Sequence, residues 1–195
     1  MQWLQHYGIK GQKWGLRRFQ NTDGTWTEEG KKRYGGSGEK SQTLFVSGSS
    51  KTQDSDSPYY RKRLPKAIRE ELDRSMKAKE KIVVGDAPGI DRQVQDYLNK
   101  KKYDSVEVYG PGKQIRYSAN KKWKATAIDD PQHEPYSPEW LRKKDEFMTQ
   151  ISDKGLAVIL DEGSRATRNN IQRLIDQEKS VKVYMLNKNG KDRWV

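Results

Sequence analysis

The stretch Lys81-Ile82-Val83-Val84-Gly85-Asp86-Ala87-Pro88-Gly89-Ile90-Asp91 decides the fold of this chain. Residues 82–84 form an apolar run that is typical of a strand buried on both faces of a sheet. Small and polar residues then turn the chain into a helix, in which Ile90, Val94 and Leu98 repeat every four residues along one side. A buried strand that passes through a glycine-containing turn into an amphipathic helix is the repeating unit of a parallel sheet covered by helices.

The same alternation of buried strand and amphipathic helix recurs on both sides of this unit. Upstream, residues 44–46 predict a strand, and Leu64, Ile68 and Leu72 predict one face of a helix that begins near Pro65. Downstream, the apolar runs and periodic stretches predict further strands and helices, with strands at 105–109, 156–160 and 181–186 and helices at 138–152 and around 171–175.

This order of elements defines the fold class that we expect. Residues 41–195 should form an α/β, Rossmann-like three-layer domain with a mainly parallel five-stranded sheet. Residues 110–136 carry no apolar run and are expected to be irregular. A chain of 195 residues has room for one such domain and an extension.

Composition excludes several classes of protein. Only 32% of the residues are hydrophobic and 34% are charged, so we expect part of the chain to lie outside any core. No apolar run approaches the ~20 residues that cross a bilayer, and no signal-peptide pattern opens the chain, so we expect no membrane partner. Because there is no Cys and the two His are far apart, at 6 and 133, we expect no metal, no cofactor and no Cys- or His-based catalytic centre.

Residues 1–40 differ from the rest of the chain. They hold 8 of the 16 Gly and 3 of the 6 Trp, namely Trp3, Trp14 and Trp26, and they show no helical or strand periodicity. The run at 35–38 is typical of a flexible linker. Two interpretations stay open, a disordered tail and a basic Gly/Trp-rich module that docks its aromatic side chains on a partner.

Three loops follow the ends of predicted strands, where ligands bind in sheets of this kind. In the first, Ser47-Gly48-Ser49 offers hydroxyls and a close backbone approach. In the second, residues 85–91 aim backbone N–H groups at an anion, and Asp86 could accept hydrogen bonds from ribose hydroxyls. In the third, residues 161–170 combine Gly, hydroxyls and Arg at the start of a helix.

Each loop could also have a purely structural role, because Gly, Asp and Ser commonly form strand-to-helix turns and cap the helices that follow. None of the loops is a dinucleotide fingerprint or a Walker A loop. Three such loops in one domain nevertheless favour a ligand site. The candidate ligand-binding residues are Ser47, Gly48, Ser49, Gly85, Asp86, Gly89, Asp91, Gly163, Ser164, Arg165, Thr167 and Asn170.

Residues 43–187 resemble the SLOG superfamily of Rossmann-like domains, which includes the LOG nucleotide phosphoribohydrolases. The resemblance is carried by 45–49, by 84–91, by Arg116, Asn120, Trp123, Lys144-Asp145 and Met148, and by Gly163-Ser164, Thr167 and Asn169-Asn170. It implies a pocket for a nucleotide or an NAD-derived ligand, either ADP-ribose-like or a cyclic signalling nucleotide. It also implies that phosphate lies on the loop at Gly163–Thr167.

One position departs from the pattern of the LOG hydrolases, which carry Gly-Gly-x-Gly-Thr-x-x-Glu. If Thr167 matches the Thr of that motif, the position of the Glu falls on Asn170. An amide cannot act as a general base or stabilise an oxocarbenium ion as a carboxylate can, so binding is favoured over N-glycosidic cleavage. Asp145 remains the candidate catalytic carboxylate, although it could instead form a solvated ion pair with the neighbouring lysines.

The N-terminal segment resembles a short module of phage and prophage proteins that is fused to virion-associated proteins. The residues are His6-Tyr7-Gly8-Ile9-Lys10-Gly11-Gln12-Lys13-Trp14-Gly15, then 17–21, 23–24 and 30–34. The resemblance implies a phage protein in the host bacterial cytoplasm or in the virion, with a capsid or head-protein contact through residues 1–40. A ligand-binding protein of this origin could act in anti-defence by sequestering a host immune signal.

Other partners stay open. The net charge of +12 and the basic runs at 61–63, 100–102 and 121–124 are compatible with weak nucleic-acid contact, although no helix-turn-helix, zinc-finger or RNP motif is present. Tyr117 and Trp123 could stack on a base or cover the edge of the sheet. Domains of this size often pair through their helices, so we expect a homo-oligomer.

Overall fold

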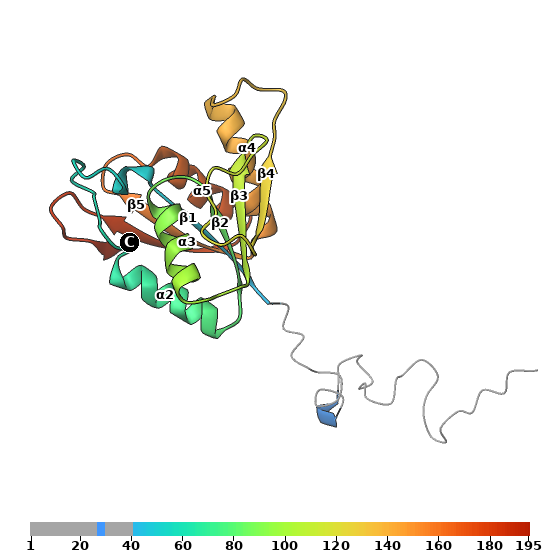
Figure 1. The fold of residues 1–195 in the computed structure, drawn as a ribbon. Coiled ribbons are helices and arrows are strands. Elements are labelled where there is room, and N and C mark those ends of the chain that lie inside the picture. The colour runs from blue at the N-terminus through green and yellow to red at the C-terminus, as the bar shows by residue number, and fades with distance from the viewer. Residues whose placement is uncertain (1–26, 30–40) are drawn as a thin grey trace, which may run out of the picture. The chain divides into compact units, whose positions relative to one another are not determined.

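A computed structural model describes residues 27–29 and 41–195 (Figure 1). Residues Ser41–Val195 form one unit. The predictions for the N-terminal module, including its tryptophans, its linker and its capsid contact, lie outside the described residues. Within the described part of the chain, no helix is long and apolar enough to cross a membrane.

A seven-stranded sheet forms the middle layer of this unit. Its strand order is β4-β3-β2-β1-β5-β6-β7, and every neighbouring pair is parallel except β6 and β7. The α/β class and the mainly parallel sheet are therefore confirmed. The strands are β1 (Thr43–Gly48), β2 (Lys81–Gly85), β3 (Val106–Pro111), β4 (Lys124–Ile128), β5 (Lys154–Leu160), β6 (Ser180–Leu186) and β7 (Arg193–Trp194).

The five predicted strands are all present, and β4 and β7 extend the sheet at its two edges. The expectation that 110–136 is irregular throughout was wrong at β4. This strand reads Lys-Ala-Thr-Ala-Ile and has no fully buried residue, so it lacks the apolar run that marks an interior strand. β7 has only two residues and is held by pairing with β6 and by a ring contact of Trp194 with Tyr184.

Helices cover both faces of the sheet, as Figure 1 shows. One hydrophobic cluster joins α2 (Lys66–Lys77) and α3 (Ile90–Lys100) to Leu44 and Val46 on one face. A second, smaller cluster joins α4 (Pro138–Ile151) and α5 (Arg165–Asp176) to Phe45 on the other. Because side chains alternate between the faces of a strand, the apolar run of β1 serves both cores, and the three-layer fold is confirmed.

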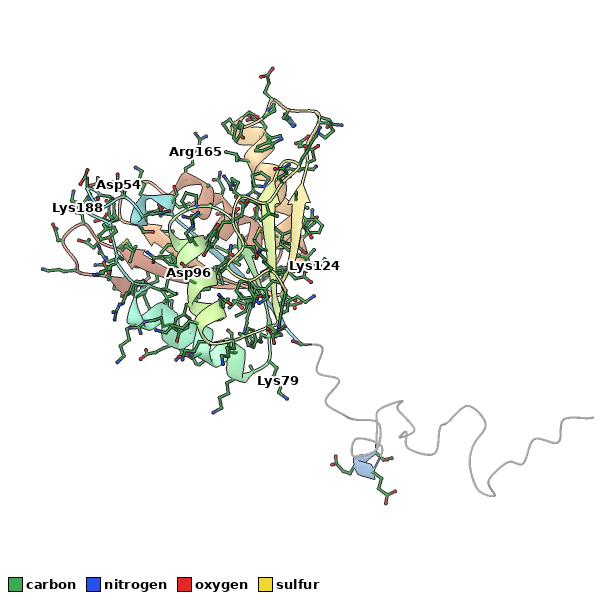
Figure 2. All side chains as sticks on the ribbon, in the orientation of Figure 1. Asp54, Lys79, Asp96, Lys124, Arg165 and Lys188 are labelled. Carbon is green, nitrogen blue, oxygen red and sulfur yellow. The ribbon has the colours of Figure 1, made fainter. Side chains whose placement is uncertain are left out.

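Charged side chains lie on the outside of these layers. Lys79, Lys124 and Lys188 are exposed, as their positions in Figure 2 illustrate. The interior of the sheet between them is apolar, with Val46, Val84 and Val158 fully buried. The polar composition is thus a property of the surface, and it leaves the core intact.

The position of β1 in the middle of the sheet fixes where a ligand can bind. The chain passes from β1 to β2 and β3 on one side, and returns through β5 and β6 on the other. The strand order therefore reverses next to β1, and the loops that leave β1, β2 and β5 lie beside one another at the same edge. Open α/β sheets bind their ligands at such a switch point.

Close packing of the end of β1 against the start of α3 depends on Gly48. A Cβ on Gly48 would lie 2.4 Å from Ile90 Cβ, an atom that cannot move without the backbone. A short helical turn, η1 (Ser50–Thr52), follows, and Ile90 N donates a hydrogen bond of 3.2 Å to Ser49 O. The first two of the three predicted loops are therefore held together by direct backbone contact.

Gly48→Ala should lower the free energy of unfolding by about 1–3 kcal/mol, because the added methyl group forces β1 and α3 apart. Urea unfolding of the variant and the unchanged chain measures the effect. Gly155→Ala is the matched control, because its Cβ would also meet an atom at 2.4 Å, but that atom is the movable Leu174 Cδ1. A smaller loss for Gly48→Ala than for Gly155→Ala would contradict the proposed packing.

Candidate functional site

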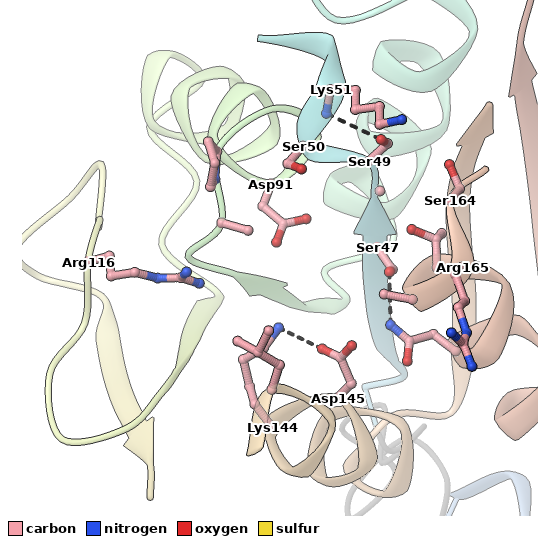
Figure 3. A pocket seen from close by; sticks show the side chains of 17 residues that line it. Ser47, Ser49, Ser50, Lys51, Asp91, Arg116, Lys144, Asp145, Ser164 and Arg165 are labelled. Atoms are coloured by element: carbon pink, nitrogen blue, oxygen red, sulfur yellow. Dashed lines mark hydrogen bonds and ion pairs between the residues drawn. The ribbon is translucent and has the colours of Figure 1, made fainter. Parts of the chain in front are cut away.

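A pocket of about 500 Å³ opens at the carboxyl edge of the sheet, where the three predicted loops meet (Figure 3). The loop after β1, the loop between β2 and α3, and the first turns of α5 form its walls. Arg116 from the loop after β3 and residues of α4 complete it. The volume lies in the range of small-molecule sites in proteins.

The structure brings most of the predicted site residues into this pocket. The candidates that line the pocket are Ser47, Gly48, Ser49, Asp91, Asp145, Ser164, Arg165, Thr167 and Asn170. The candidates Gly85, Asp86, Gly89 and Gly163 do not line it. Gly85, Asp86 and Gly89 instead contact residues that line the pocket, and so determine how those residues are placed.

Asp86 does not present its carboxylate to the pocket as a free ribose acceptor. The residue is buried, and its Oδ2 accepts hydrogen bonds from Arg116 N at 2.9 Å and Arg116 Nε at 3.1 Å. Its Oδ1 accepts from Arg116 Nη2. This hydrogen bonding raises the pKa of the Arg116 guanidinium. Asp86 therefore fixes Arg116, which does line the pocket.

The two glycines of the second loop make room for their neighbours. A Cβ on Gly85 would lie 2.2 Å from Asp91 Oδ2 and 3.1 Å from Lys144 Nζ, so both groups reach over the bare backbone. Gly89 has a positive φ of 84° and packs against the backbone of Ser49. A side chain at either position would displace the groups that line the pocket.

The buried amide of Gln95 holds the loop that carries Arg116. Its Nε2 donates to Gly85 O at 2.8 Å, and its Oε1 accepts from Ala119 N at 3.0 Å. Both ends of the amide are thus satisfied within the fold. This link ties the irregular segment after β3 to the end of β2, and so positions one wall of the pocket.

Lys144 is a pocket residue that was not among the candidates. Only about 10% of its side chain is exposed, and its Nζ lies 2.6 Å from Asp145 Oδ1. Burial opposes the charge, but Asp145, Asp91 and Asp86 outweigh it and raise the pKa of the ammonium. The burial of Lys144 could have been predicted from the sequence. It stands midway between Trp140 and Met148, at intervals of four, and this spacing places all three residues on the buried face of one helix.

The candidate Asp145 is therefore neither a surface carboxylate nor unpaired. Its side chain is 15% exposed, lines the pocket and is bound to Lys144. In Figure 3 the two side chains rise from α4 toward the space below Asp91.

Asp91 is the most perturbed acid of the site. Burial raises its pKa to about 7, the nearby carboxylates Asp145 and Asp86 add to this, and Lys144 opposes it. One carboxyl oxygen, Oδ1, lies buried without a hydrogen-bond partner within the described residues. Near neutral pH the group therefore exchanges between a neutral acid and a carboxylate.

Asn170 bridges α5 and β1. Its Nδ2 donates to Ser47 Oγ at 3.1 Å, and its Oδ1 accepts from Arg173 Nη1 at 2.7 Å. The residue is buried next to Thr167 on the same helix. The amide thus holds the third loop against the first one.

Positively charged and positively polarised groups lie around the mouth of the pocket. α5 begins after Ser164, which adopts a left-handed conformation at φ 57°, and no side chain caps the helix. Backbone N–H groups of the first turn lack partners within their own helix. Lys51 and Arg165 also line the mouth, and within the described residues neither side chain forms an ion pair. Together these groups attract negative charge.

The two aromatic residues whose role was open have different surroundings. Trp123 is buried in the larger core, and its Nε1 donates to Tyr103 O at 3.0 Å, so it packs between the sheet and α3. Tyr117 donates its hydroxyl to Asp96 and lies under the guanidinium of Arg92, at 4.3 Å from the ring centre. Neither residue lines the pocket.

The described residues hold no cluster of His, Cys, Asp and Glu that could bind a metal.

The chain matches no protein-family model and no curated protein. The resemblances to the SLOG superfamily and to the phage module therefore stay predictions. The case for a functional site therefore depends on the geometry of the pocket alone.

The pKa of Asp91 yields a prediction of stability against pH. In the unfolded chain an Asp titrates near 3.9, whereas in the folded protein Asp91 titrates at about 7. Between these values the folded state holds a proton that the unfolded state has lost, so the contribution of Asp91 to stability falls as the pH rises and is lowest above pH 7.

Asp91→Asn, which cannot ionise, should therefore gain stability relative to the unchanged chain as the pH rises, by about 3 kcal/mol between pH 4.5 and pH 8. Urea unfolding of both proteins at the two pH values measures this. Asp104→Asn removes an exposed carboxylate and serves as the control, with no such pH-dependent gain. A difference for Asp91→Asn that is equal at both pH values would show that burial does not perturb this group.

Proposed function

We propose that residues 41–195 bind a nucleotide or an NAD-derived ligand, ADP-ribose-like or cyclic, in the pocket at the carboxyl edge of the sheet. The observation that carries the proposal is the meeting of three small-residue loops at the switch point. At the mouth lie uncapped helix amides and two cations without an ion-pair partner in residues 27–29 and 41–195. This combination suits a ligand that has phosphate at one end and hydrogen-bonding groups at the other.

The chemistry of the pocket supports one orientation of such a ligand. Phosphate suits the first turn of α5, where Arg165, Ala166 and Thr167 line the pocket and no side chain caps the helix. Ribose and base hydroxyls or amines suit the interior, where Ser47 and Asp91 offer oxygen atoms. The cationic mouth would also attract the ligand before it binds.

Binding is favoured over hydrolysis by the groups around Asn170. The Asn170 amide, which falls on the Glu position of the LOG hydrolases if Thr167 matches their Thr, is engaged on both sides, by Ser47 and by Arg173. Binding without cleavage would remove the ligand from solution. In a phage-encoded protein, this would sequester a host signal.

N-glycosidic hydrolysis is the second candidate, and one observation favours it. The pocket holds two carboxyl groups in different environments, Asp91 with a pKa near 7 and Asp145 bound to Lys144. Such a difference can separate the roles of acid and base. Hydrolysis would add water across the bond between ribose and base and release the free base.

Isothermal titration of the full chain with ADP-ribose, and with a cyclic dinucleotide as a second probe, tests the proposal. We expect binding of at least one probe by the unchanged chain. Arg165→Ala should weaken that binding about tenfold or more, because it removes a charge-assisted contact to phosphate. Ser50→Trp should abolish it by filling the pocket from an exposed position.

Arg193→Ala is the matched control, because it removes the same charge from exposed β7, outside the pocket. Absence of binding to both probes, or binding that both pocket variants retain, would overturn the proposal. Chromatography of the titrated mixture distinguishes the second candidate, since release of free base that is lost in Asp145→Asn would indicate cleavage.

A further inference from the structure

A second concave surface lies between α2 and α3, away from the pocket. It has a volume of about 540 Å³ and shares no lining residue with the pocket. We call it the α2–α3 groove; its lining residues are Lys62, Arg63, Leu64, Arg69, Gln93, Asp96, Tyr97, Lys100 and Lys101. In Figure 2, Asp96 at the groove and Arg165 at the pocket are well separated.

The groove is strongly cationic. Five of its lining residues are basic and one is acidic. Within the described residues, no carboxylate lies in ion-pair distance of Lys62, Arg63, Arg69 or Lys100. Surface cations of a folded protein commonly have acidic neighbours, so a concave surface with four unpaired ones concentrates positive potential.

The acidic side chains around the groove are already engaged. Asp73 accepts from Tyr97 OH at 2.7 Å and pairs with Lys101 at 3.3 Å. Asp96 accepts from Tyr117 OH. In the first half of α2, Glu70 pairs with Lys66 at 3.5 Å. Within the described residues, none of these carboxylates pairs with the four cations, and Asp96 is the one negative charge on the groove wall.

The cations stand at both ends of the groove. Gln93 Nε2 donates to Arg61 O at 2.7 Å, which holds the segment of Lys62 and Arg63 beside the first half of α3. Lys100 follows Gln93 by seven residues, and thus by about 10 Å along the helix. Tyr97, on the turn between them, contributes an aromatic ring to the wall.

We propose that the α2–α3 groove binds the phosphate backbone of a single-stranded nucleic acid. A row of cations that extends along a groove matches a chain of evenly repeated phosphates better than a single compact anion. Grooves of this charge with an aromatic wall follow single strands in other proteins, because the backbone lies along the cations while bases contact the ring.

Fluorescence anisotropy of the full chain with a fluorescein-labelled oligodeoxythymidine, at near-physiological salt, tests this inference. Lys62→Gln/Lys100→Gln removes one cation from each end of the groove. We expect about tenfold weaker binding, and a decrease of about 1.4 in the slope of log affinity against log salt for two lost phosphate contacts. Both positions are exposed, so the variant should fold.

Lys121→Gln/Lys122→Gln is the matched control, since it removes the same charge from exposed residues outside the groove. It should change the affinity less than about twofold. Three results would overturn the inference: equal losses in both double variants, no binding by the unchanged chain, or binding of a duplex without binding of the single strand. Titration of ADP-ribose into the groove variant should match the unchanged chain, so the two proposals fail independently.

Discussion

The pocket depends on the absence of a side chain at Gly85. Over this residue the two helical layers, which the sheet otherwise separates, approach each other: Asp91 comes from α3 on one face and Lys144 from α4 on the other. A buried ammonium and a buried carboxyl group each cost several kcal/mol of desolvation when unpaired. For Lys144 the nearby carboxylates outweigh that cost, whereas for Asp91 the attraction of Lys144 offsets it only in part, so the pKa of Asp91 stays raised.

The same contacts determine how charge is distributed in the site. Arg116 and Lys144 are each bound to a carboxylate, and Asp91 is close to half protonated at neutral pH, so the interior carries little net charge. Lys51 and Arg165 lie at the mouth and form no ion pair with any residue that the structure describes, so the remaining positive charge of the pocket is there. An anionic group is therefore attracted to the mouth, whereas the interior selects for neutral groups that form hydrogen bonds.

The sequence predicted those parts of the fold and site that rest on local pattern. Strands buried on both faces have continuous apolar runs, so β1, β2 and β5 could be found, and the loops that follow them marked the pocket. The edge strand β4 has no such run, because it packs on only one neighbour. The engagement of Asp86 could not be predicted, since its partner Arg116 is 30 residues away in a segment without periodicity.

Helix α3 shows how one short element serves several surfaces at once. Val94 and Leu98 pack in the core, Gln95 holds the loop after β3, and Asp91 at the N-terminus faces the pocket. The remaining side of the helix, with Tyr97 and its neighbours, forms a wall of the α2–α3 groove. Because a helix repeats every 3.6 residues, eleven residues present all of these sides. A shift in the register of α3 against the sheet would therefore disturb the core, the pocket and the groove together, which constrains its sequence more tightly than burial alone.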